Sequence, residues 1–148
     1  MSTACRCQSG LLYDDCCRPF HLSLAAAPTA ERLMRSRYCA FALQDGAYLL
    51  KTWHPSTRPV SIDLDPEMRW HQLQILSRSG GGLLDRSGTV EFVARYRAAG
   101  TTGEQHENSY FVRADGAWLY SGPADGRPSL LRPQPVRPEL SRDLRDRS

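Results

Sequence analysis

Four of the five cysteines of this 148-residue chain lie before residue 18: Cys5, Cys7, Cys16 and Cys17, in the spacing C-x-C-x8-C-C. Only Cys39 lies elsewhere. The N-terminus lacks the charged-then-apolar pattern of a secretion signal, so we expect a cytoplasmic protein. Disulfides are rare in that compartment, and clustered cysteines there indicate metal ligands or redox groups.

The spacing of the cluster suits a tetrahedral metal site. Cys5 and Cys7 can hold one side of an ion, and Gly10 can reverse the chain with a positive φ. A short helical turn over residues 11–15 can then deliver Cys16 and Cys17. Four thiolates close a zinc shell at about 2.3 Å per bond and leave no position for substrate. Because so short a loop has almost no core, we expect zinc binding to supply most of its folding free energy.

The spacing alone leaves other interpretations open. Cys16 and Cys17 could form a vicinal disulfide or redox pair. His21 could replace Cys17 as the fourth ligand, because it lies four residues further on. Four unrelated thiols and an iron–sulfur cluster, which also takes four thiolates, are further alternatives. We expect Cys39, inside a predicted helix, to be a buried and inert thiol.

Residues 5–17, CRCQSGLLYDDCC, resemble the SEC-C zinc motif C-x-C-x-S-G-x-x-Y-x-x-C-C/H. The match includes Ser9, Gly10 and Tyr13 as well as the cysteines. It implies that the four cysteines bind zinc and that Tyr13 packs in the small core. The motif is best known at the carboxyl end of the SecA translocase, where it contacts a chaperone. The resemblance therefore also implies a protein partner, whose identity it does not give.

The next part of the chain has the periodicity of helices. Thr29 is a suitable N-cap, and apolar residues at three- and four-residue steps predict a helix over residues 31–43. A second short helix is expected over residues 47–53, where His54-Pro55 ends it.

The period then changes to that of strands, which we expect at residues 70–77, 90–98, 105–113 and 117–121. Asp115-Gly116 predicts a tight turn, and a second hairpin turn is expected over residues 100–103. Val90, Phe92, Ala94 and Tyr96 should share one face of their strand. Helices followed by an antiparallel meander indicate an α+β fold with the helices packed on one face of a sheet of about four strands.

Four further blocks resemble the YchJ family of small bacterial proteins: residues 33–41, 52–59, 90–96 and 106–111. The resemblance implies a cystatin-like domain of the nuclear-transport-factor-2 type, in which a curved sheet wraps a helix around a cone-shaped cavity. We therefore expect a zinc knuckle over residues 1–22 and this domain over residues 28–122. Residues 123–148 are rich in Pro and Arg and should form a mostly disordered tail.

Five polar residues are candidates for groups in that cavity: His54, His106, Glu91, Glu107 and Arg35. Only one of His106 and Glu107 can face it, because neighbours on a strand point to opposite sides. Polar groups in an apolar cavity have shifted pKa values and can act as general acids or bases. The structural interpretation is favoured, in which His54 bonds its following loop and Arg35 or Arg37 pairs with Glu91 or Glu107.

These observations rank three functions. The leading hypothesis is a non-enzymatic interaction or adaptor protein with a structural zinc site, because no phosphate-binding loop and no nucleophile elbow is present. The alternative is a small-molecule-binding protein or enzyme that uses the cavity. The third is salt-sensitive nucleic-acid association, which a net charge of +3 does not favour. No apolar run is long enough to span a membrane, and a homodimer through the open sheet face is compatible with the fold.

Overall fold

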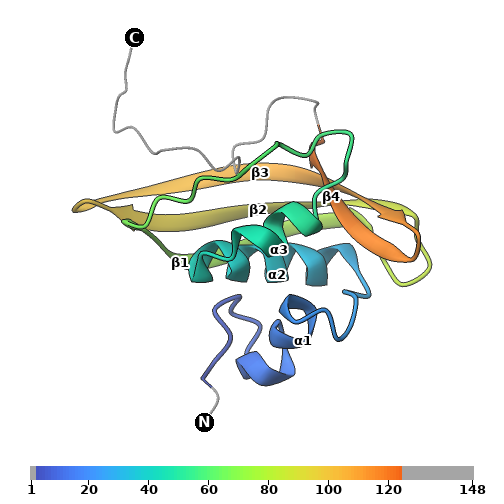
Figure 1. The fold of residues 1–148 in the computed structure, drawn as a ribbon, viewed down its shortest axis with the longest axis horizontal. Coiled ribbons are helices and arrows are strands. Elements are labelled where there is room, and N and C mark those ends of the chain that lie inside the picture. Colours follow the sequence, from blue (N-terminus) through green and yellow to red (C-terminus); the bar gives the residue numbers. More distant parts are fainter. Residues whose placement is uncertain (1–2, 125–148) are drawn as a thin grey trace.

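An N-terminal module and a sheet domain make up residues 3–124, the part of the chain that this computed structural model describes (Figure 1). The N-terminal module, residues 3–22, holds the 3-10 turn η1 (Tyr13–Asp15) and the short helix α1 (Arg18–His21). The sheet domain holds the helices α2 (Ala30–Leu43) and α3 (Gly46–Lys51), then the strands β1 (Met68–Gly80), β2 (Ser87–Ala98), β3 (Thr101–Ala114) and β4 (Ala117–Pro123).

Both predicted helices of the sheet domain are present and begin at side-chain caps. The Thr29 hydroxyl accepts the Arg32 N–H at 3.1 Å, and the Asp45 carboxylate accepts the Tyr48 N–H at 3.1 Å. Helix α3 ends at Lys51, before the predicted residue 53, because Trp53 forms a parallel bridge with Tyr120 of β4. Helix α1 was not among the helices expected from the sequence.

The strands form the predicted antiparallel meander, in the order β1-β2-β3-β4. Asp115 and Gly116 turn with φ values of 52° and 80°, as expected. The other hairpin turn begins before the predicted residues 100–103. Ala99 and Gly100 make it with φ values of 50° and 83°, so the strand resumes at Thr101. A two-residue turn of this type needs positive φ at both positions, and Ala99 adopts it despite its Cβ.

Helix α2 lies between the sheet and the N-terminal module (Figure 1). On the sheet side, Val90, Phe92 and Ala94 of β2 are at most 1% exposed, as their predicted common face requires. Trp70 of β1 packs its ring against Phe41 of α2, with centroids 6.1 Å apart. One helix therefore supplies packing surface to both parts of the molecule.

The expected tail begins at residue 123, but the sheet reaches further. Pro123 ends β4, and the Ala124 N–H donates to the Asn108 carbonyl at 2.7 Å. The remainder of the expected tail, residues 125–148, lies outside the described residues. Between residues 3 and 124, no helix combines the length and apolarity needed to cross a bilayer.

Candidate metal centre

The four clustered cysteines meet in the interior of the N-terminal module. The sulfurs of Cys5, Cys7, Cys16 and Cys17 all lie within 4.8 Å of one another. Each residue is at most 4% exposed, and none forms a disulfide. The Cys7–Cys16 and Cys16–Cys17 sulfur distances are 3.5 and 3.9 Å. A tetrahedral ion with bonds of about 2.3 Å would place its sulfurs about 3.8 Å apart, so this geometry is compatible with a metal site.

The backbone of the module brings the cysteines together by a tight reversal. The Cys5 N–H donates to the Leu11 carbonyl at 2.8 Å, which closes the loop between the two halves of the motif. Gln8 and Gly10 take φ values of 65° and 93°, both in the left-handed region. The turn η1 then leads directly into Cys16 and Cys17.

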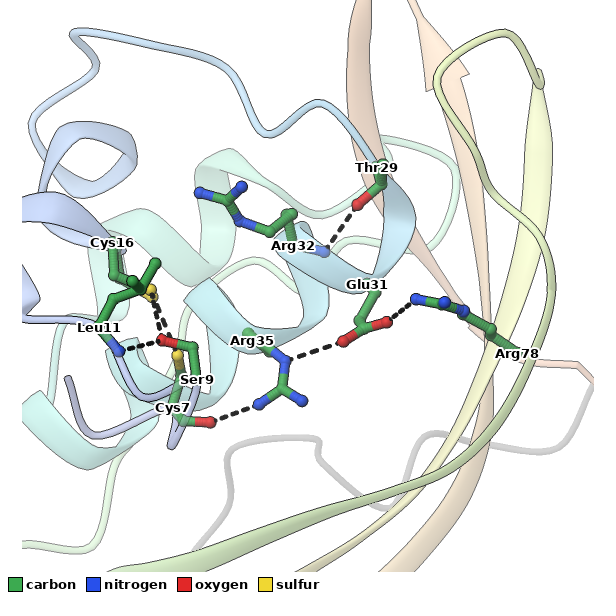
Figure 2. Close-up of polar contacts among 10 residues, drawn as sticks. Cys7, Ser9, Leu11, Cys16, Thr29, Glu31, Arg32, Arg35 and Arg78 are labelled. Atoms are coloured by element: carbon green, nitrogen blue, oxygen red, sulfur yellow. Dashed lines mark hydrogen bonds and ion pairs between the residues drawn. The ribbon is translucent and has the colours of Figure 1, made fainter.

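Polar groups outside the cluster fix the positions of its sulfurs (Figure 2). The Ser9 hydroxyl lies 3.1 Å from the Cys16 sulfur and accepts the Leu11 N–H at 3.2 Å. Because one lone pair is used in this way, the hydroxyl hydrogen is free to point at the sulfur. Arg35 of α2 donates from Nη1 to the Cys7 carbonyl at 2.7 Å. Contacts of this kind orient metal ligands and tune their affinity.

Cys39 of α2 lies against this cluster, with its sulfur 4.0 Å from that of Cys5. Hydrogen bonds from the Cys17 and Cys5 thiols lower the pKa of Cys39 to about 4. The pKa of Cys17 is raised in turn, chiefly by its hydrogen bonds with Cys39 and Cys5. Ionisation of one thiol thus disfavours ionisation of its neighbours. A bound cation would allow several of them to be thiolates together.

His21 faces the sheet domain, and both of its ring nitrogens are in hydrogen bonds. Tyr13 Oη lies 2.7 Å from Nδ1, and the Ser36 carbonyl of α2 lies 2.9 Å from Nε2. A carbonyl only accepts, so Nε2 carries the hydrogen and Nδ1 accepts from Tyr13. Burial raises the pKa of Tyr13 to about 12, which keeps that donor protonated. This arrangement disfavours His21 as a replacement for Cys17.

The module also contacts the first strand through one side chain. Gln8 donates from Nε2 to the His71 carbonyl at 3.1 Å, and its Oε1 accepts the Leu73 N–H at 3.2 Å. The contact falls where β1 shifts register between Trp70 and Gln72. The Gln8 amide thereby ties the motif to the first strand.

Arg35 lies on the module side of α2 and pairs with neither Glu91 nor Glu107. Its Nε donates to Glu31 Oε2 at 3.0 Å, and the other Glu31 oxygen contacts Arg78 of β1. Figure 2 shows the resulting line of contacts from Cys7 through Arg35 and Glu31 to Arg78. Arg35 thus joins the module, α2 and the sheet.

The other candidate groups lie apart from one another. Glu91 and His106 meet across β2 and β3, with Oε2 and Nε2 2.7 Å apart and side chains 33% and 55% exposed. They lie on the sheet face opposite α2, and the hydrogen bond from His106 lowers the pKa of Glu91. His54 bonds the Ser56 hydroxyl through Nδ1 at 2.8 Å, as its structural interpretation predicts.

Glu107 is the one candidate in the interior beside α2. It is 4% exposed, and its Oε2 accepts the hydroxyls of Ser109 at 2.5 Å and Tyr120 at 2.6 Å. Arg37 of α2 interacts electrostatically with this carboxylate. The candidate groups therefore do not converge on one place.

Arg37 is the centre of this interior cluster and was not among the candidate cavity groups. Its Nη1 donates to the Leu49 carbonyl at 2.8 Å and to the Thr52 hydroxyl at 2.7 Å. Its guanidinium carbon lies 4.6 Å from the Tyr120 ring centroid. Burial lowers its pKa to about 10, so it remains a cation at neutral pH. The available signal was the position of Arg37, four residues after Leu33 and four before Phe41, on the apolar face of the predicted helix.

Two clefts in the described structure are lined by residues other than the five candidates. One, of about 340 Å³, lies between the start of α2 and residues 78–83. The other, of about 410 Å³, is lined by residues from 20–27, α3 and the start of β4. None of the five candidate cavity residues lines either cleft.

Comparisons with known proteins agree with this architecture. The model of a family described as "YchJ, middle NTF2-like domain" matches residues 29–123. A UPF0225 protein of Streptomyces coelicolor is 54% identical over 122 residues, which cover 82% of this chain and 93% of that protein. A UPF0225 protein of Deinococcus radiodurans is 42% identical over 124 residues, which cover 82% of this chain and 88% of that protein.

Two solved structures share the fold. The solution structure of a SEC-C motif containing protein from Rhodopseudomonas palustris has a TM-score of 0.69 and 39% identity, covering 82% of this chain and 95% of that chain. The crystal structure of a SEC-C motif containing protein from Psychrobacter arcticus has a TM-score of 0.67 and 29% identity. The match covers 90% of this chain and 84% of that chain.

Proposed function

The chain belongs to the YchJ family, and from this membership and the cysteine geometry we propose that it is a zinc-binding interaction protein. The metal site is structural, and the N-terminal module binds a protein partner. The observation that carries the proposal is a contrast within the module. Its four thiols are buried, whereas three leucines of the same module are 48–51% exposed: Leu11, Leu12 and Leu22.

The metal site supports a structural role because its donors are already complete. Four thiolates fill a tetrahedral zinc shell, whereas catalytic zinc keeps a position for water or substrate. The residues match zinc chemically, since thiolates are soft ligands that favour zinc over magnesium or calcium. Zinc would fix the loop that displays Leu11 and Leu12 on its surface.

The exposed leucines support a binding role because about half of each side chain is open to solvent. Isolated apolar residues are common on protein surfaces, but groups of them mark contacts with other molecules. Leu11 and Leu12 are adjacent in the motif, between Gly10 and η1, so a partner that covers one reaches the other.

The enzymatic alternative lacks the convergence that it predicted. Glu91 and His106 pair on the exposed sheet face, whereas Glu107 lies in the interior. A general acid and a general base must both reach the same reacting group. The interaction function therefore has the better support.

The test compares paired serine substitutions in the full chain. Leu11→Ser with Leu12→Ser should retain one zinc per chain, measured by elemental analysis, and should lose specific partners in cross-linking and affinity purification. The control is Leu83→Ser with Leu84→Ser, since these two leucines are 65% and 95% exposed on the β1–β2 loop of the sheet domain. Equal recovery of the same partners by the Leu11/Leu12 variant would contradict the proposal.

A further inference from the structure

Five thiols surround a site that needs four, and we infer that Cys39 of α2 is an interchangeable ligand able to take the place of Cys17. The inference rests on the proposed zinc site and extends it from the N-terminal module into the sheet domain. It assigns Cys39 a metal-binding role, in place of the inert thiol expected from the sequence.

The position of Cys39 meets the geometric requirement for a ligand. Its sulfur is 4.0 Å from that of Cys5, close to the separation of about 3.8 Å between two sulfurs bound to one tetrahedral zinc. The residue is 0% exposed, so neither water nor solvent ions compete for the thiol.

The contacts of Cys39 identify the ligand that it can replace. Its sulfur contacts that of Cys5 and its thiol interacts with that of Cys17, so it lies beside these two corners of the cluster. Cys16 lies at another corner, with its sulfur 3.5 Å from Cys7 and 3.1 Å from the Ser9 hydroxyl. Loss of Cys17 leaves a vacancy next to Cys39, whereas loss of Cys16 leaves one on the side of Ser9.

Because Cys39 lies on α2, its binding to the metal would link the module to this helix. Helix α2 is held by the sheet on one side, through Phe41 and Trp70, and by the module on the other. A metal bond to Cys39 would therefore connect the module directly to this helix. Cys5, Cys7 and Cys16 would still provide the remaining three thiolates.

The experiment uses Co²⁺ alone as the probe, because its thiolate charge-transfer absorption scales with the number of bound sulfurs. Four full-length proteins are compared: the natural sequence, Cys17→Ser, Cys16→Ser, and Cys17→Ser combined with Cys39→Ser. We expect Cys17→Ser to retain the four-thiolate intensity. Cys16→Ser and the double variant should each lose about a quarter of it, since one of four ligands is gone.

Zinc competition with a chelator provides a second readout. Cys17→Ser should bind zinc at least about tenfold more tightly than Cys16→Ser, because even groups outside the ligand shell change affinity tenfold or more. Three-thiolate intensity in Cys17→Ser, or a Cys17→Ser protein that loses metal or fold while Cys16→Ser keeps both, would overturn the inference. Absence of a thiolate spectrum in the natural sequence would instead contradict the proposed zinc site itself.

Discussion

The N-terminal module and the sheet domain pack against the same helix but have interiors of different chemistry. In residues 3–22, the buried side chains are four cysteines and Phe20. The interior of the sheet domain contains large apolar and aromatic side chains, among them Phe92, Phe111 and Tyr120. Apolar burial contributes about 25 cal/mol per Å² to stability. The sheet domain buries many apolar side chains and benefits from this contribution, whereas the module buries few. Under the proposed function, a metal would take the place of an apolar core in the smaller part.

The two interiors also hold charge differently. In the module, several thiols share one small volume and require a cation to become thiolates together. In the sheet domain, the charges of Arg37 and Glu107 lie in one cluster, and hydroxyl groups complete the hydrogen bonds of the carboxylate. Under the proposed function the first arrangement takes an ion from solution, whereas the carboxylate of the second takes its hydrogen bonds from side chains of the same domain. The following predictions test this difference.

Metal removal should have the largest effect and should separate the two regions. Structural zinc binds zinc-finger peptides with about 10–16 kcal/mol, which in so small a unit is also folding free energy. We expect a chelator to abolish hydrogen-exchange protection in residues 3–22 and to leave that of β2 and β3 in place. Exchange measured by mass spectrometry checks this. Simultaneous loss of protection in both regions would show that the domain depends on the metal as well.

Glu107→Ala should destabilise the sheet domain without affecting metal binding. It leaves the buried hydroxyls of Ser109 and Tyr120 without their acceptor and removes the carboxylate that interacts with Arg37. Each buried donor left unsatisfied costs about 1–3 kcal/mol. Denaturant unfolding followed by tryptophan fluorescence measures the change. Glu104→Ala is the matched control on the same strand, because that side chain is 57% exposed and its ion pair with Arg95 contributes little. Equal effects of the two substitutions would refute the assignment of Glu107 to an interior charge cluster.

Gln8→Ala should weaken the connection between the regions. It removes both hydrogen bonds to β1, and we expect a loss of about 1 kcal/mol in the stability of the docked module. The Leu73 amide should exchange faster, as measured by NMR. Gln72→Ala, an exposed residue on the same strand, serves as the control. An unchanged exchange rate at Leu73 would indicate that other contacts hold the module in place.

The smallest effect should come from the exposed pair of Glu91 and His106. The folded-state pKa of Glu91 is below its ordinary value of 4.5, so the unfolded state binds more protons as the pH falls. Its stabilising contribution is therefore present above pH 4.5 and disappears as the pH drops through the folded pKa. The melting temperatures of the natural sequence and Glu91→Gln should differ at pH 7 and approach each other as the pH falls below 4.5. Glu67→Gln, at an exposed site, should show no such convergence.

The sequence predicted local features better than relationships across space. Alternation along β2 identified the buried face of Val90 and Phe92, and the cysteine spacing identified the cluster, because both signals lie within a few neighbouring residues. The place of Cys39 beside the cluster depends on how α2 packs, and no local pattern contains that information. Likewise, strand alternation separated His106 from Glu107 but did not say which of them faces α2.

The contact between Gln8 and β1 has a consequence for self-association. Strand β1 is at the edge of the sheet, and such edges offer unpaired backbone groups to other chains. The Gln8 amide occupies one carbonyl and one N–H of that edge, as a neighbouring strand would. When metal loss releases the module, these groups become open to pairing with another molecule. In this protein, zinc supply and resistance to aggregation are therefore expected to rise and fall together.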